Sequence, residues 1–399
     1  MHHSKKIISM LTGIILSVSM FAQSPKPLLQ VIDSALQKAV AQYKYMGTVL
    51  PGDKFPKTWY PLTKKQETSN SSWWCSGFYP GSLLYLYEYS KDPALLTEAN
   101  RIDKLLEKEQ FNKGTHDLGF MMYCSFGNAN RLQPSKEYDE ILLNSAKSLS
   151  TRFNATAGVI KSWDHGTWKY PVIIDNMMNL ELLFWATRYS GDSSYYKIAV
   201  SHANTTMKNH FRADYSSYHV VDYDVTDGSV ISKKTHQGYA DYSAWARGQA
   251  WGLYGYVVMY RATKDQKYLT HANNIAKFIM SRPNLPEDKI PFWDYNSPEI
   301  PATYRDASAA AITASALMEL CKYGNDEERK QSYIRFAEKV IRSLSTQTYT
   351  APIGENGGFI LKHSTGHLPG NSEVDVPLTY ADYYYIEAMM RYKGLKGKK

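Results

Sequence analysis

The sequence repeats one pattern five times, and this repeat limits the possible folds more than any other feature. Each copy is a helix rich in aromatic and small residues, then a short turn, then a charged amphipathic helix. One such unit cannot bury its apolar face alone, so neighbouring copies must stack around a shared core. The predicted helical hairpins span residues 76–109, 118–153, 176–210, 243–282 and 306–344.

Two further predicted helices, at residues 28–45 and 378–392, have no hairpin partner next to them in the sequence. If these two helices pair with each other, the array closes into a ring of six hairpins. We therefore expect an all-α fold, an (α/α)6 six-hairpin barrel or toroid that forms a single domain. An open solenoid is the alternative. Strand patterns are few: short strands are expected at 218–225, 230–233 and 358–361, and a polar loop at 46–70.

The N-terminus has the pattern of an export signal. Lys5 and Lys6 precede an apolar run over residues 7–21, and the small residue Ala22 follows it. This pattern predicts a signal peptide at 1–22, one domain at 23–399, and a periplasmic protein. The run is short for a membrane span, and no later stretch is long and apolar enough to be one. The chain has three cysteines, an odd number without motif spacing, which predicts free thiols.

Composition narrows the possible ligands. The net charge is +8, and part of this excess lies at the two ends of the chain, which is typical of solvated basic tails. A positive net charge also suits an acidic substrate. No nucleic-acid motif accompanies the charge. Glycine-rich phosphate loops, a nucleophile elbow and grouped metal ligands are absent from the sequence, so we expect no cofactor and no metal. The 32 tyrosines and 9 tryptophans offer flat faces that suit sugar rings or helix packing.

The residues that could carry chemistry come before or at the start of the predicted inner helices. Because these helices run parallel in such a ring, their N-termini should meet at one mouth, where free N–H groups favour anions. Asp175, Asp306 and Asp382 could equally be helix N-caps, and Arg247 could form a structural ion pair. Two carboxylates at one sugar site, here Asp117 and Asp175, are typical of glycosidases.

Four segments resemble the unsaturated glucuronyl hydrolases, glycoside hydrolase family 88. They are residues 73–81 (WWCSGFYPG), 116–120 (HDLGF), 173–180 (IIDNMMNL) and 246–255 (ARGQAWGLYG), and the similarity extends in order from about Trp73 to Arg391. Members of this family are (α/α)6 barrels, which agrees with the number of hairpins counted from the repeat. The resemblance implies that residues 23–399 are a catalytic domain.

The resemblance also implies a reaction and a set of site residues. The family removes the unsaturated uronic acid from the non-reducing end of oligosaccharides made by polysaccharide lyases, by hydrating its C4=C5 double bond. Asp175 would protonate C4 and then activate water for C5, so its pKa should be raised. Asp117 would hold the sugar near C4, and Arg247 would face the substrate carboxylate. The other implied substrate-binding residues are His116, His219, Gln237, Trp251, Trp163 and Trp74.

Several choices stay open at this point. The substrate could come from chondroitin, hyaluronan or heparan, with or without sulfate, and the segment Lys362–His367 has no secure match to the family's sulfate-sensing loop. The first alternative is the related hydrolysis of unsaturated rhamnogalacturonan fragments from pectin. The second is a non-catalytic sugar-binding protein on the same barrel. The protein is expected to be a monomer or a dimer.

Overall fold

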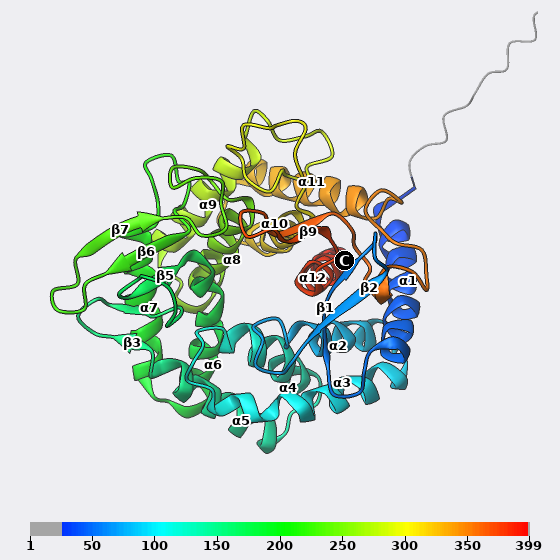
Figure 1. Ribbon diagram of the computed structural model, residues 1–399, viewed down its shortest axis with the longest axis horizontal. Coiled ribbons are helices and arrows are strands. Elements are labelled where there is room, and N and C mark those ends of the chain that lie inside the picture. Colours follow the sequence, from blue (N-terminus) through cyan, green and yellow to red (C-terminus); the bar gives the residue numbers. More distant parts are fainter. Residues whose placement is uncertain (1–25, 398–399) are drawn as a thin grey trace, which may run out of the picture.

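The computed structural model describes residues 26–397, so the predicted signal peptide at 1–22 lies outside the described residues. Helices form a closed double ring around a central axis (Figure 1). The inner ring holds α2 (Phe78–Ser90), η2 (Gly119–Gly127) with α4 (Asn128–Leu132), η3 (Ile174–Asn179) with α6 (Leu180–Ser190), α8 (Ala246–Thr263), α10 (Ala307–Leu320) and α12 (Thr379–Lys396). The outer ring holds α1 (Leu28–Val49), α3 (Pro93–Leu106), η1 (Glu107–Phe111), α5 (Lys136–Ser150), α7 (Ser193–Asn209), α9 (Gln266–Met280) and α11 (Glu327–Leu344).

The two helices without a neighbouring partner close the ring, as the repeat predicts. Helix α12 packs between α10 and α2, and α1 contacts both α11 and α12 on the outside. The expected (α/α)6 barrel is therefore confirmed, and the open solenoid is excluded. The inner helices approach each other closely, because a Cβ added to Gly255 of α8 would lie 2.5 Å from Cβ of Met177 in the neighbouring inner segment.

Short turns with defined caps join the inner helix to the outer helix within the hairpins. Outer helices α3, α7, α9 and α11 each follow an aspartate whose side chain accepts a backbone N–H of the first turn. Inner helices α2, α6 and α8 each end before a residue in the left-handed conformation, which stops the helix and reverses the chain. Each such turn reverses the chain, so the inner helices of successive hairpins start at the same end of the barrel.

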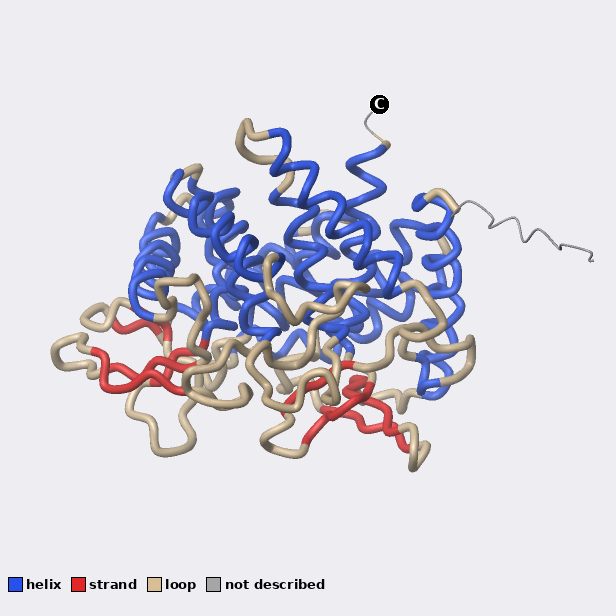
Figure 2. Tube along the Cα trace, turned by 90° about the horizontal axis from the view of Figure 1, so that it is seen from above, coloured by secondary structure: helices blue, strands red, loops and turns tan. Residues whose placement is uncertain are grey.

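The loops and strands gather at that end (Figure 2). They form the hairpins β1–β2 (Phe55–Tyr60, Lys65–Ser69), β3–β4 (Phe153–Asn154, Val159–Ile160) and β8–β9 (Ser364–His367, Ser372–Val376), and the antiparallel sheet β5–β6–β7 (Pro171–Ile173, Val220–Tyr223, Val230–Lys234). The strands expected at 218–225 and 230–233 are confirmed. The strand expected at 358–361 is wrong, because Gly357 and Gly358 have positive φ and form a turn. The loop expected at 46–70 is also wrong in part, since it contains β1 and β2.

The sequence predicts no membrane span after residue 22 and free cysteine thiols, and residues 26–397 allow both predictions to be examined. No helix in this part of the chain is long and apolar enough to cross a bilayer. Cys75, Cys124 and Cys321 are all free thiols, and Cys75 and Cys321 are buried. The fold is therefore held together by its core of packed inner and outer helices rather than by disulfides.

Asp103 on α3 is a buried carboxyl group whose two oxygens have no hydrogen-bond partner among the described residues. Burial alone raises its pKa well above the usual value. The folded state therefore binds more protons than the unfolded state, and the free energy of unfolding falls as pH rises above about 4. We expect Asp103→Asn to stabilise the protein by about 1–3 kcal/mol at pH 8. Urea unfolding should show a larger gain at pH 8 than at pH 5.5; equal gains would contradict the burial argument.

Candidate active site

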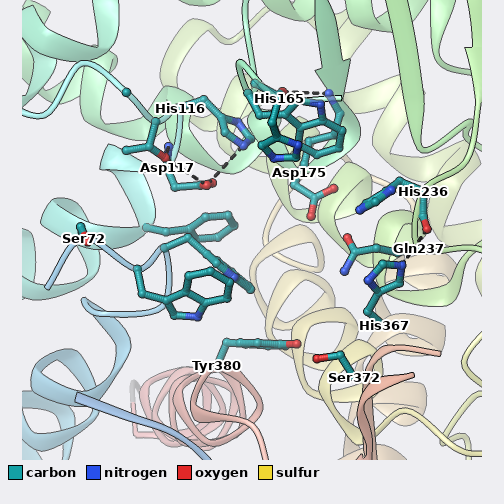
Figure 3. Close-up of a pocket in the computed structure, with 18 of the residues that line it drawn as sticks. Ser72, His116, Asp117, His165, Asp175, His236, Gln237, His367, Ser372 and Tyr380 are labelled. Carbon is teal, nitrogen blue, oxygen red and sulfur yellow. Dashed lines mark hydrogen bonds and ion pairs between the residues drawn. The ribbon is translucent and has the colours of Figure 1, made fainter. Parts of the chain in front are cut away.

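A cavity of about 600 Å³ opens at the end of the barrel that carries the loops (Figure 3). Seven of the nine residues expected at the site line it: Trp74, His116, Asp117, Trp163, Asp175, Gln237 and Arg247. The other two lie directly behind the cavity wall. His219 contacts Asp175, and Trp251 is fully buried and packs its ring 5.0 Å from that of Phe120. Trp251 therefore supports the floor of the cavity from below.

Asp175 belongs to η3, which begins directly where strand β5 ends. The pairing of β5 with β6 continues one residue further, since the Ile174 N–H donates to the carbonyl of His219. The N-cap of η3 is Ile173, and no side chain caps it, so the interpretation of Asp175 as a helix cap is wrong. The side chain instead points into the cavity, and its Oδ2 has no hydrogen-bond partner among the described residues.

The environment of Asp175 favours the protonated carboxyl group. Burial is the largest cause and raises its pKa to about 7; the Arg247 charge lowers the pKa, and the nearby Asp117 carboxylate raises it. This direction agrees with the expectation for a general acid. An acid with a pKa near 7 can both give and take a proton close to neutral pH.

His219 on the loop before β6 faces Asp175 with a defined tautomer. Its Nδ1 accepts the backbone N–H groups of His236 and Gln237, at 3.0 and 3.1 Å. Burial and neighbouring positive charges hold the pKa of His219 well below its usual value, so the ring is neutral and carries its proton on Nε2. This Nε2–H lies 3.8 Å from Oδ2 of Asp175. His219 thus presents a hydrogen-bond donor close to Oδ2 of Asp175.

Asp117 approaches from the neighbouring inner segment and is held by three side chains. His116 Nε2 lies 3.3 Å from its Oδ2, the Thr115 hydroxyl donates to the same oxygen, and Asn179 donates to Oδ1 at 3.4 Å. Asn179 is four residues after Asp175 and also accepts the Phe120 N–H. This asparagine, which sequence reasoning missed, ties the segments of the two carboxylates together.

Arg247 is engaged by the protein itself. Its Nη1 pairs with Asp306 Oδ2 at 3.0 Å and donates to the Thr365 carbonyl, and its Nη2 donates to the Gly366 carbonyl. Asp306 and β8 therefore hold the guanidinium in place, while Arg247 also lines the cavity, so its role facing the substrate carboxylate stays a prediction. The structural ion pair considered from the sequence is confirmed.

The two other aspartates at helix starts differ from each other. Asp306 is the N-cap of α10 and accepts the Ser308 N–H, as expected for a cap. Asp382 is not a cap, because the N-cap of α12 is Leu378. The Asp382 carboxylate instead accepts the backbone N–H groups of Ile360 and Leu361, both at 2.8 Å, and holds the preceding loop.

Residues without a predicted role line the outer part of the cavity. Lys57 comes from β1, His367 from β8, and Ser372 and Glu373 from β9. His367 ends the segment 362–367 whose role the sequence left open, and the other three were missed because neither hairpin was predicted. Lys57 Nζ lies 5.0 Å from the centre of the Trp73 ring, so this part of the rim presents a positive charge beside an aromatic face.

With this geometry known, comparison with other proteins identifies the family. No protein-family model matches the sequence. A protein of Formosa agariphila named unsaturated glucuronyl hydrolase is 46% identical over 355 residues, which cover 88% of each chain. The chain belongs to the unsaturated glucuronyl hydrolase family. It is therefore a glycosidase, and the alternative of a non-catalytic sugar-binding protein is not supported.

Two further relatives extend this result. The crystal structure of an unsaturated glucuronyl hydrolase described as specific for heparin superimposes with a TM-score of 0.90 at 48% identity, covering 92% of this chain and 98% of the other. A protein of Streptococcus agalactiae named unsaturated chondroitin disaccharide hydrolase is 31% identical, covering 91% of this chain and 90% of the relative. The similarity thus includes nearly the whole barrel and its loops.

Proposed function

We propose that this glycosidase removes the unsaturated uronic acid from the non-reducing end of glycosaminoglycan oligosaccharides left by polysaccharide lyases. The observation that carries the proposal is Asp175, a buried carboxyl group with a pKa of about 7 that faces the cavity of a chain of this family. The substrates in the names of two relatives, heparin and chondroitin disaccharide, support a glycosaminoglycan. Hydrolysis of unsaturated rhamnogalacturonan fragments is the alternative that the assay below separates.

In the proposed reaction, the protonated Asp175 gives its proton to C4 of the C4=C5 enol ether, and positive charge develops at C5 and the ring oxygen. Water then adds its hydroxyl to C5 and returns a proton to Asp175. The resulting hemiketal opens to a ketone at C5, which leaves a hemiacetal at C1 that expels the next sugar as an alcohol. One water molecule is consumed, and Asp175 ends in its starting state.

The residues around Asp175 suit these steps. The Nε2–H of His219 lies 3.8 Å from Oδ2 of Asp175, which places a hydrogen-bond donor beside the carboxyl group, while the attacking water would reach Asp175 from the cavity that it lines. Asp117, held in place by His116 and Asn179, would accept hydrogen bonds from hydroxyl groups of the sugar. Trp74, Trp163 and Gln237 line the wall against which the sugar rings would pack. Arg247 also lines the cavity and contributes its positive charge there.

The pH dependence of kcat/KM tests the role of Asp175 as the acid. Only free enzyme with Asp175 protonated can start the reaction, so kcat/KM should be constant below pH 7 and fall about tenfold per pH unit above the pKa of about 7. In the enzyme–substrate complex, the negative carboxylate of the substrate should raise the pKa of Asp175 further, so the fall in kcat should begin at a higher pH than the fall in kcat/KM. A rate that stays constant from pH 6 to pH 9 would exclude Asp175 as the acid in the free enzyme.

The absorbance of the conjugated C4=C5 bond provides the direct test of function. Unsaturated disaccharides from chondroitin, heparan and rhamnogalacturonan are incubated with the enzyme side by side. Loss of absorbance with a glycosaminoglycan product is the expected result. Loss of absorbance with the rhamnogalacturonan product alone would assign the alternative activity to the protein. No loss of absorbance with any substrate would overturn the proposal.

We further propose that the enzyme is exported to the periplasm, with residues 1–22 as signal peptide and 23–399 as the mature catalytic domain. The proposal is supported by the basic and apolar pattern of the N-terminus. Mass spectrometry of the protein from a periplasmic fraction should find Gln23 as the first residue. A chain that begins at Met1 would contradict it. Sedimentation would determine whether the mature enzyme is the expected monomer or dimer.

A further inference from the structure

A second cavity, of about 330 Å³, lies beside the active-site cavity, and Asp164 lines both. We call it the basic pocket. Its charged lining residues are Lys113, Arg152, Lys161 and Asp164, so three positive charges face one carboxylate. The two residues next to Asp164, Trp163 and His165, line the active-site cavity. The loop that supplies the wall of the active site therefore also supplies a wall of the basic pocket.

Arg152 forms the floor of the basic pocket and retains an unused donor. Its side chain is only 6% exposed. Nε donates to the Lys161 carbonyl, and Nη1 donates both to the Lys113 carbonyl and to Asp164 Oδ2, at 2.8 to 2.9 Å. Nη2 is buried and has no partner among the described residues. A buried guanidinium nitrogen without a partner is costly, which indicates that a ligand or water completes it.

The remaining charges of the basic pocket are not balanced. Lys161 Nζ lies 2.8 Å from Asp164 Oδ1. The pKa of Asp164 is held below its usual value by Lys161 first and by Arg152. This single carboxylate can offset only one of the three positive charges. The ammonium group of Lys113 is exposed and has no ion-pair partner within residues 26–397.

We propose that the basic pocket binds an oxyanion, a sulfate or carboxylate, carried by a sugar of the substrate beyond the unsaturated uronic acid. A guanidinium edge flanked by two ammonium groups is the chemistry that recognises such groups. Because Asp164 lines both cavities, the basic pocket lies next to the active site, close enough for one acidic oligosaccharide to reach both. This inference rests on the proposed function, whose substrate it makes more specific.

The test removes the two lysine side chains and keeps Arg152, whose contacts hold two active-site loops. The variant is Lys113→Ala/Lys161→Ala, and the matched control is Lys108→Ala/Lys147→Ala, which removes two exposed charges that line neither cavity. Each enzyme is assayed at constant ionic strength with an unsaturated disaccharide that has a neutral second sugar, its O-sulfated form, and an unsaturated tetrasaccharide with a second uronic acid.

The expected result is a selective loss. For the variant, kcat/KM on one or both of the acidic substrates falls about tenfold, while kcat/KM on the neutral disaccharide and all values of the control stay within about twofold. Equal loss on every substrate, or no loss on any, would overturn the proposal. Failure of the wild type to hydrolyse any substrate would overturn the proposed function instead.

Calorimetry with inorganic sulfate separates the anion from the sugar that carries it. Wild type and control should bind sulfate, and the lysine variant should not. This binding does not require turnover, so it tests the basic pocket even if the proposed function fails. Sulfate bound by wild type without any selective loss on acidic substrates would assign the pocket to a free anion and overturn the substrate proposal. No sulfate binding together with no selective loss would overturn the oxyanion site itself.

Discussion

Asp175→Asn is expected to leave the barrel folded and to abolish turnover. Asparagine matches the protonated carboxyl group in shape, but it can neither give a proton to C4 nor take one from water. Because the same group serves both steps, we expect kcat to fall by about 10⁴-fold or more. The folded protein should lose no stability, since the carboxyl is buried with a free Oδ2 and a pKa of about 7, and the substitution removes the cost of its ionisation. Absorbance of the C4=C5 bond measures turnover, and circular dichroism measures the fold.

Asp103→Asn provides the matched control for this prediction. It makes the same chemical change at another buried carboxyl without a partner, but on outer helix α3 and away from the cavity. The control should keep full activity. Full activity of Asp175→Asn would exclude its role as acid and base. Equal loss in both variants would mean that the loss comes from the buried substitution and not from the chemistry.

The helical ring was predictable because its signals are local and repeated. Outer helices α3, α7, α9 and α11 bury residues at three- and four-residue spacing, and each follows an aspartate cap, Asp92, Asp192, Asp265 or Asp326, in the short turn of its hairpin. The hairpin β1–β2 was not predictable in the same way. Its strands are short, Pro56 interrupts the first, and the pairing contains a bulge between Pro56 and Thr58, so alternation does not appear in the sequence.

The site was predictable only where it depends on helix starts. Asp117 and Asp175 could be placed at one mouth because inner helices run parallel, but whether Asp175 caps a helix or faces a cavity depends on the extension of β5 to Ile174, which leaves no sequence signal. His219 sits in a long connection, and only the family resemblance suggested it. Its tautomer depends on two backbone N–H groups some 17 residues away, a contact that only the folded chain forms.

Arg247→Met is the second substitution with a large expected effect. The Arg247–Asp306 pair is almost completely buried, at 1% and 0% side-chain exposure, and methionine leaves Asp306 as an unpaired buried charge. We expect the free energy of unfolding to fall by about 3–5 kcal/mol, as for other broken buried pairs. The Thr365 carbonyl also loses its donor and the Gly366 carbonyl keeps only Gln237, so β8, which ends in His367, should be less well held, and KM should rise. Chemical denaturation and steady-state kinetics measure the two effects.

Pairing this change with Asp306→Asn separates the charge from the packing. Asparagine can still cap α10 through its side-chain oxygen but carries no charge, so Arg247→Met/Asp306→Asn should recover part of the stability lost in Arg247→Met. In the double variant, the pH above which kcat/KM falls, called here the alkaline limit, should not return to its wild-type value. Arg247 lowers the pKa of Asp175, so without it the fall in kcat/KM should begin at higher pH whichever residue occupies position 306. A limit that returns to its wild-type position together with stability would mean that Arg247 acts on Asp175 only through the fold. A limit that stays shifted, with stability restored, would show that the charge of Arg247 acts directly on the acid.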